Sequence, residues 1–241
     1  KRNAVTRELL QLLLTAVRDA RKDPDLRLLV LQAKGDVFCA GMDLAEMQQT
    51  ATSPNPEQLW EQDARVYQEI LWEIASFPQP TLAVLPGPAL AGGVGLVLAC
   101  DLVLGTDTVQ FSLPEPKRGI LAAVVLPLLL YKLGVGASNW LLLSGETCSA
   151  SQALQWGLLH QSVPRDQLPA ATERLIRQIL TGSPEALAAT KRQVWSCVGS
   201  SLKEQLLAAV PVSGSMRHTP DAREGLAAFV EKRPPSWTPN R

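Results

Sequence analysis

Strand and helix signals alternate along this chain up to about residue 163, and only helix signals follow. Short apolar runs such as "LRLLVLQ" and "TLAVL" are typical of buried strands, and each precedes a turn and a helical segment. From Pro164 onward the strand signals stop, and two or three helices are expected. This order predicts an α/β fold, with a core in residues 1–163 and a helical region in residues 164–241.

Charge and hydropathy narrow the classes of partner. Lys plus Arg number 23 and Asp plus Glu number 23, and no basic run occurs. A neutral chain of this kind has no electrostatic basis for binding nucleic acid or an anionic membrane. The longest apolar runs are interrupted by Gly, Pro or charge before about 18 residues, so no membrane span is expected.

The cysteines and histidines indicate a reducing compartment and give no pattern typical of a metal site. The four cysteines are far apart and form no CxxC pair, so they are predicted to be buried reduced thiols: Cys39, Cys100, Cys148 and Cys197. The chain opens "KRNAVTRELL", without the apolar segment of a signal peptide. We expect a cytoplasmic location, or a mitochondrial or peroxisomal one in a eukaryote. The two histidines are also far apart, which predicts no metal ligation.

A glycine-rich run, "PALAGGVGLVLACD" from Pro88 to Asp101, follows the strand "TLAVL". Glycine allows a ligand to approach the main chain closely, and the first amides of a helix have no partner within the helix. An oxygen that gains negative charge could be held there by backbone N–H groups. The segment "FCAGMDL" has the same strand, turn and helix order, so the amides of Met42 and Gly92 could converge on one oxygen.

Two other interpretations of these turns compete with an oxyanion site. A dinucleotide loop requires G-x-G-x-x-G, but the third glycine position after Gly93 and Gly95 is Leu98. Alternatively, both turns need glycine only for packing. The pattern alone leaves this last alternative open.

Several ordered motifs together resemble the crotonase superfamily, the enoyl-CoA hydratase/isomerase family. They are "RNA" at residues 2–4, "FCAGMDL", "AGGVGLVLACD", "SLPEPKRGI", "ASQALQWGLLHQSVP" and "DAREGLAAFVEKRPPSW". The resemblance runs nearly end to end and implies a ββα-spiral core with the acyl-CoA site, followed by a C-terminal helical trimerisation region. The strand pair that usually precedes "RNA" in this family is not part of the sequence.

The resemblance also implies partners and site residues. These enzymes bind acyl-CoA thioesters, form trimers or hexamers, and stabilise a thioester enolate between two backbone amides, which match Met42 and Gly92 here. No cofactor is expected apart from the coenzyme A of the substrate. Contacts with the CoA part of the substrate are expected at Arg2, Ala40, Asp43 and Lys232.

The acidic residues suggest which reaction is catalysed. Hydratases of the family use two glutamates to hold and activate a water; by position the first matches Gly95 and the second matches Glu115. A single glutamate at the second position resembles the enoyl-CoA isomerases, in which one carboxylate moves a proton from C2 to C4 of a 3-enoyl thioester. The apolar "LAAVVLP" that follows would raise the pKa of Glu115 by desolvation.

Two alternatives to isomerisation stay open. The first is hydratase, hydratase-lyase or decarboxylase chemistry, since some hydratase-lyases and decarboxylases of the superfamily also lack the first glutamate and recruit other groups. In the second alternative Glu115 is an exposed loop acid paired with Lys117 or Arg118, and the protein is a catalytically silent acyl-CoA-binding subunit.

Overall fold

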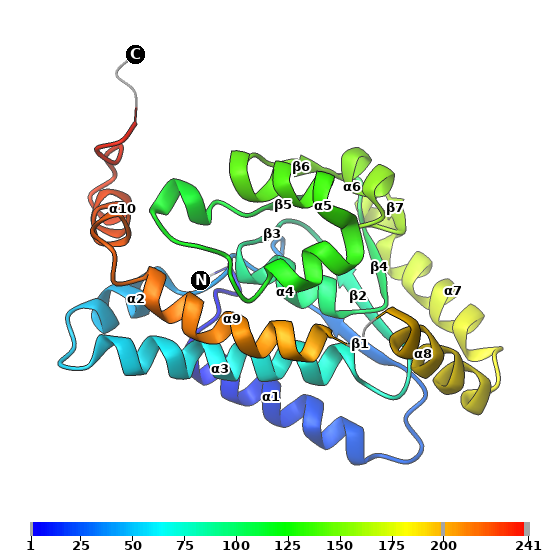
Figure 1. Ribbon diagram of the computed structural model, residues 1–241. Coiled ribbons are helices and arrows are strands. Elements are labelled where there is room, and N and C mark those ends of the chain that lie inside the picture. The colour runs from blue at the N-terminus through cyan, green and yellow to red at the C-terminus, as the bar shows by residue number, and fades with distance from the viewer. Residues whose placement is uncertain (1, 199–200, 239–241) are drawn as a thin grey trace.

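Two small sheets form the centre of the protein, which a computed structural model describes over residues 2–198 and 201–238 (Figure 1). The strands are β1 (Leu29–Gln32), β2 (Thr81–Leu85), β3 (Ala89–Leu90), β4 (Leu102–Thr106), β5 (Gln110–Ser112), β6 (Cys148–Ser149) and β7 (Gln161–Val163). One sheet is parallel throughout, in the order β1-β2-β4-β7. In the other, β5 pairs in parallel with β3 and antiparallel with β6.

Helices connect and cover these strands. They are α1 (Arg7–Lys22), α2 (Leu44–Ala51), α3 (Pro56–Ala75), α4 (Gly92–Ala99), α5 (Leu126–Ser144), α6 (Ala150–Trp156), α7 (Leu168–Leu180), α8 (Pro184–Val198), α9 (Leu202–Met216) and α10 (Pro220–Val230), with short 3₁₀ helices η1 (Glu115–Arg118) and η2 (Arg165–Gln167). The α/β architecture expected from the alternating pattern is therefore confirmed. After Pro164 the described residues form four α-helices, one more than the largest number expected.

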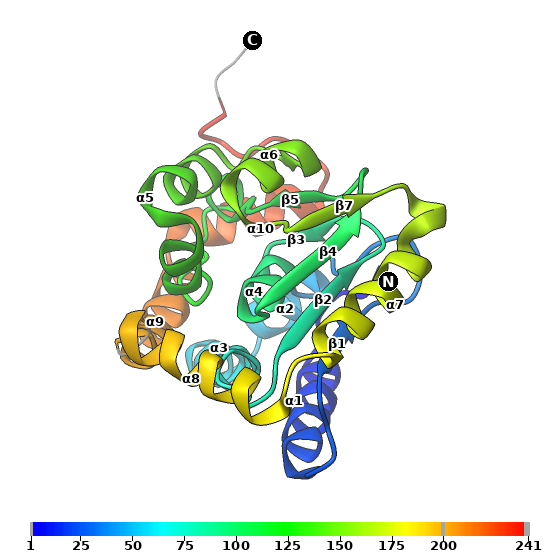
Figure 2. The same ribbon diagram turned by 90° about the vertical axis from the view of Figure 1, so that its right-hand side faces the viewer.

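The parallel sheet is buried on both faces because successive side chains point to opposite sides. On one face Leu82, Val84 and Leu104 pack with Leu168 and Ala171 of α7. The residues that alternate with them on β2 and β4 belong to the main core, which α3 and α4 complete. Figure 2 shows α7 and α4 on opposite sides of this sheet. Strand β1 at the edge is only partly buried, although a buried strand was expected.

Local sequence accounts for where several helices begin. Thr6 accepts a hydrogen bond from the backbone N–H of Leu9 and so caps α1, and Asp43 accepts from Ala45 and Glu46 and caps α2. Each cap satisfies amides that lack a partner within the helix. The capping role of Asp43 fixes the chain just beyond the Met42 turn.

The C-terminal helices fold back onto the core of the same chain. Helix α9 lies beside α3, and α1, α3 and α9 run side by side (Figure 1). Helix α10 packs directly against η1: a Cβ placed on Gly225 would lie 2.2 Å from the carbonyl oxygen of Arg118. On α8, Lys191 donates to the carboxylate of Asp101 at 2.6 Å. The contact of α10 with η1 brings residues after 200 next to residues near 115.

Helix α5 is, by length and composition, the one helix of the described chain that could cross a membrane. Core helices of soluble proteins also pass this criterion. At Gly134 the backbone leaves the helical region, with φ 68° and ψ 178°, so two shorter helices meet there. Neither half reaches the roughly 20 residues that a bilayer requires.

The cysteines differ from the sequence expectation in one respect. Cys39, Cys100 and Cys148 are buried free thiols, as predicted, but Cys197 is exposed on α8. It lies near the end of a helix whose outer side carries no covering element in the described chain. In the described ranges, no group of three or more His, Cys, Asp or Glu residues is arranged to hold a metal ion.

Candidate active site

Two turns from different parts of the chain lie against each other at the site. The backbone N–H of Leu90 donates to the carbonyl oxygen of Cys39 at 2.8 Å, and the N–H of Phe38 donates to Pro88 at 2.9 Å. A Cβ on Gly41 would lie 2.6 Å from the Cβ of Ala91 and 3.5 Å from the nitrogen of Gly92. Only glycine at position 41, with φ 83°, allows this approach.

The amides of Met42 and Gly92 are next to these contacts and remain available. Within residues 2–198 and 201–238, neither N–H donates a hydrogen bond to a protein group. Gly92 is the first residue of α4, whose N-terminal amides have no acceptor within the helix. Ala91 just before it holds φ 50° and ψ −127°, a conformation unusual for a residue with a side chain. Backbone strain of this kind is concentrated at functional sites.

Glu115 begins η1, directly after β5, and its side chain is buried. Its exposed fraction is 7%, and its Oε2 atom is buried without a hydrogen-bond partner in the described chain. Burial raises the pKa of Glu115 to about 7, although its own backbone N–H, Arg118 and Arg217 favour the ionised form. The carboxyl can therefore gain or lose a proton near neutral pH.

The exposed, ion-paired loop acid considered for Glu115 is not what the structure contains. Lys117 pairs instead with Glu146, at 2.7 Å. The guanidinium of Arg118 lies 4.8 Å from the ring centre of Phe229. The segment is a 3₁₀ helix rather than an open loop, and α10 covers it. Burial under α10 thus leaves one oxygen of Glu115 without a protein partner.

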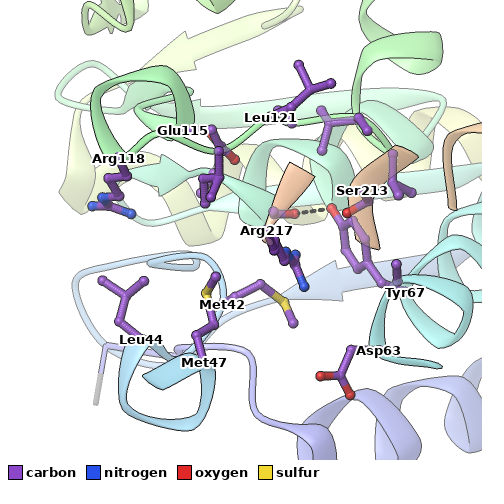
Figure 3. Close-up of a pocket in the computed structure, with 18 residues that line it drawn as sticks. Met42, Leu44, Met47, Asp63, Tyr67, Glu115, Arg118, Leu121, Ser213 and Arg217 are labelled. Carbon is purple, nitrogen blue, oxygen red and sulfur yellow. Dashed lines mark hydrogen bonds between the residues drawn. The ribbon is translucent and has the colours of Figure 1, made fainter. Parts of the chain in front are cut away.

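A cavity joins these elements (Figure 3). Its lining includes Met42, Gly92 and Glu115, which are far apart in the sequence. One wall is the apolar segment expected to face the site, residues 121–125. Met47 and Tyr67 also line the cavity. Its largely apolar lining with a few polar groups is typical of small-molecule sites.

The other four predicted contact residues do not line this cavity. Arg2 and Lys232 are exposed, and Lys232 follows the end of α10. The N–H of Ala40 donates to the carbonyl oxygen of Arg2 at 3.2 Å, so Ala40 lies in the turn itself. Asp43 is buried as the cap of α2.

Tyr67 of α3 occupies the space beside Gly95. Its hydroxyl donates to the carbonyl oxygen of Gly92 at 2.5 Å, which Figure 3 shows as a dashed line. A Cβ on Gly95 would lie 2.1 Å from that hydroxyl oxygen. A glutamate at position 95 is therefore incompatible with Tyr67 in this place. The sequence showed that the acid is missing at 95, but not that a phenol takes its space.

Two cavity residues come from the region after residue 164. Ser213 of α9 and Arg217, just after α9, line the cavity together with Glu115. Sequence analysis placed the site within residues 1–163 and missed both. No local motif marks either residue, since only the return of α9 onto α3 brings them to the site. His160, by contrast, accepts from the N–H of Val103 at 2.9 Å, a structural contact.

Comparison with known proteins agrees with this geometry. The sequence profile described as "Enoyl-CoA hydratase/isomerase" matches residues 1–240. The chain belongs to the enoyl-CoA hydratase/isomerase family. This result confirms the crotonase resemblance and the crotonase fold, and the chain is accordingly an enzyme of this family.

Individual members of the enoyl-CoA hydratase/isomerase family are similar over nearly their whole length. A putative enoyl-CoA hydratase of Thermus thermophilus is 33% identical, with 98% of this chain and 93% of that protein covered. An enoyl-CoA isomerase/hydratase of Mycosarcoma maydis is 32% identical, with 98% of this chain and 88% of that protein covered. The crystal structure of a putative enoyl-CoA hydratase from Mycobacterium avium paratuberculosis superposes with a TM-score of 0.86 and is 32% identical. The match covers 99% of this chain and 90% of that one.

Proposed function

We propose that this enzyme isomerises 3-enoyl-CoA thioesters to 2-enoyl-CoA thioesters, with Glu115 as the group that carries the proton. The observation that supports this most strongly is the Glu115 carboxyl itself, which is buried on the same cavity as the Met42 and Gly92 turns and has one oxygen without a protein partner. A single acid of this kind suits a reaction that needs one base and no added water.

In the first step, the thioester oxygen accepts hydrogen bonds from the N–H groups of Met42 and Gly92. The Glu115 carboxylate removes a proton from C2, and the electrons of the broken C–H bond form the enolate. Two backbone donors stabilise the charge that develops on the oxygen, and each such donor is typically worth about 3 kcal/mol in the transition state.

In the second step, the enolate collapses and the Glu115 carboxyl returns the proton to C4. The double bond moves from C3–C4 to C2–C3, and the enzyme regains its starting state. Because the proton moves between two carbons of one acyl chain, the reaction is redox-neutral. It requires no cofactor beyond the coenzyme A of the substrate.

The space beside Gly95 supports isomerisation over hydration. In a two-glutamate hydratase the first acid would help to hold a water, and here Tyr67 fills that position and bonds to the backbone. The apolar wall of residues 121–125 offers no side-chain replacement. A hydratase, a lyase or a decarboxylase would therefore need a polar group other than an acid at position 95.

A panel of enoyl thioesters assayed with wild type and Glu115→Gln tests the proposal. Wild type is expected to convert 3-enoyl-CoA to 2-enoyl-CoA without forming 3-hydroxyacyl-CoA, and the variant is expected to bind acyl-CoA without turnover. Rapid water addition to 2-enoyl-CoA would favour a hydratase. Binding without any product from wild type would favour a silent acyl-CoA-binding subunit.

We also propose that the protein assembles as a homotrimer or hexamer. Large apolar side chains are exposed on α5, among them Val135 and Leu143, which are 64% and 78% exposed in the single chain. A second copy packed on this side would remove them from water. The mass measured by light scattering tests this assembly.

A further inference from the structure

A second, smaller cavity adjoins the candidate active site. Five residues line both cavities, namely Leu44, Met47, Arg118, Ile120 and Arg217. The two cavities are therefore separated only by these shared side chains. No step of the proposed isomerisation uses the second cavity.

The second cavity contains cationic side chains and no acid. Arg118, Arg217 and Arg223 line it, from η1, from the residue after α9 and from α10, and none of its described lining residues is Asp or Glu. In the part of the chain that the structure describes, none of these three guanidinium groups makes a hydrogen bond or an ion pair with a protein group. Arg118 has only its contact with the ring of Phe229. Three guanidinium groups thus line this cavity without a hydrogen-bonded or ion-paired protein acid in the described chain, although the charge of Glu115 in the first cavity acts on Arg118 and Arg217.

A neutral donor adds to this set. Trp60 lines the same cavity, is 4% exposed, and its buried Nε1 atom has no hydrogen-bond partner in the described chain. A buried donor without an acceptor destabilises the fold, so such a group is expected to have an acceptor when the site is filled. An indole N–H, like a guanidinium, can only donate.

Two acids that line the first cavity, Asp63 and Glu115, act on these arginines by charge without forming an ion pair with them. Asp63 lines the first cavity, and its two carboxylate oxygens accept from Nε and Nη2 of Arg7, both at 2.7 Å. Figure 3 shows Arg217 beside Met42 in the first cavity. Burial lowers the pKa of Arg217, and the charges of Asp63 and Glu115 offset part of this shift, but neither carboxylate forms a hydrogen bond or an ion pair with its guanidinium in the described chain.

We propose that the second cavity binds a carboxylate at the far end of the acyl chain, so that the substrates are monothioesters of dicarboxylic acids. The remaining lining is apolar, including Leu44, Met47 and Leu226, and suits the methylene groups of such a chain. Guanidinium groups match the two oxygens of a carboxylate geometrically. The proposal depends on the proposed function only in placing the thioester in the first cavity.

Binding of saturated thioesters tests this proposal independently of turnover. Calorimetry would compare succinyl-, glutaryl-, adipoyl- and suberoyl-CoA with counterparts in which a terminal amide replaces the carboxylate. For at least one chain length, the carboxylate is expected to bind about 10- to 100-fold more tightly, as a charged hydrogen-bonding group does. No preference for the carboxylate at any length would overturn the proposal.

Variants of the arginines identify the group responsible. Arg223→Gln and Arg217→Gln are each expected to reduce the carboxylate preference several-fold, and Arg223→Lys is expected to restore part of it. Arg174→Gln, on the exposed side of α7, is the matched control and should keep the preference. Thermal unfolding of each variant establishes that it is folded.

The CoA phosphates are the other anions that could occupy the cavity. If the arginine variants weaken carboxylate, amide and free CoA equally, the cavity binds phosphate and the proposal is wrong. If the carboxylate preference holds in a protein that isomerises no thioester, the proposed function fails and this inference stands. The two failures are therefore distinguishable.

Discussion

The Glu115 side and the Gly95 side of the cavity differ in what they offer to a substrate. Glu115 presents a buried carboxyl oxygen with no protein partner, whereas the space at Gly95 is filled by Tyr67, whose hydroxyl already bonds to Gly92. Two-glutamate hydratases of the family carry an acid at both positions. Of these two positions, only Glu115 offers a carboxyl group to the cavity.

Replacing Glu115 is expected to have the largest effect on catalysis. Glu115→Gln is expected to lower kcat by about 10²- to 10⁴-fold, because general acid–base catalysis contributes on that scale. The Kd of a saturated acyl-CoA should change little, since the two backbone amides remain. Steady-state rates and calorimetry measure both quantities. Wild-type activity in this variant would exclude Glu115 as the proton carrier.

The same residue should make stability depend on pH. The pKa of Glu115 is about 7 in the folded protein and near 4.5 when unfolded, so the folded state binds more protons between these values. The free energy of unfolding contributed by Glu115 therefore falls as pH rises from about 4.5 to 7. At pH 8, Glu115→Gln is expected to be more stable than wild type, by up to about 3 kcal/mol.

Urea unfolding at pH 5 and at pH 8 checks this expectation. The advantage of Glu115→Gln should shrink at the lower pH, where the folded wild type holds a protonated carboxyl. Glu146 is an exposed acid with an exposed partner, so Glu146→Gln is the control and should show no comparable gain in stability. An advantage independent of pH would contradict the burial of a titrating Glu115.

A glutamate introduced at position 95 is expected to destabilise the fold unless Tyr67 is also replaced. Gly95→Glu places a Cβ 2.1 Å from the Tyr67 hydroxyl, and overpacking of this kind costs about 1–3 kcal/mol. Adding Tyr67→Ala should relieve the overlap, so that the combined loss is smaller than the sum of the two single losses. Denaturant unfolding measures the coupling. Additive losses would show that the two residues do not compete for one space.

The smallest effect is expected from the Tyr67 hydroxyl alone. Tyr67→Phe keeps the ring but removes the hydrogen bond to Gly92, which should cost about 0.5–1.5 kcal/mol of stability. A modest fall in kcat is expected because Gly92 carries one of the two amides. If Tyr67→Phe instead abolished isomerisation while Glu115→Gln did not, Tyr67 rather than Glu115 would be the proton carrier.

The sequence predicts local features of the fold well. The buried strand "TLAVL" and the two glycine turns depend on neighbouring residues, and each lies where it was expected. The short strands β3 and β6 were missed, because two residues held by partners elsewhere in the chain leave no periodicity to detect.

The site was predicted where its residues are marked by motifs and missed where they are brought in from a distance. Glu115, Met42 and Gly92 come together as expected, but the partner of Lys117 is Glu146, and Arg217 reaches the cavity through the packing of α9. The conflict between Tyr67 and Gly95 depends on how α3 crosses α4. A large side chain facing a glycine is visible in a structure and not in a sequence without homologues.

Transfer of a labelled proton tests the central claim most directly. A 3-enoyl-CoA deuterated at C2 would be converted in ordinary water, and the product would be analysed by mass spectrometry and NMR. If the buried Glu115 carries the proton within a cavity closed on the Gly95 side, 2-enoyl-CoA with deuterium at C4 is expected. A 3-hydroxyacyl product, or 2-enoyl-CoA without any deuterium at C4, would contradict the account.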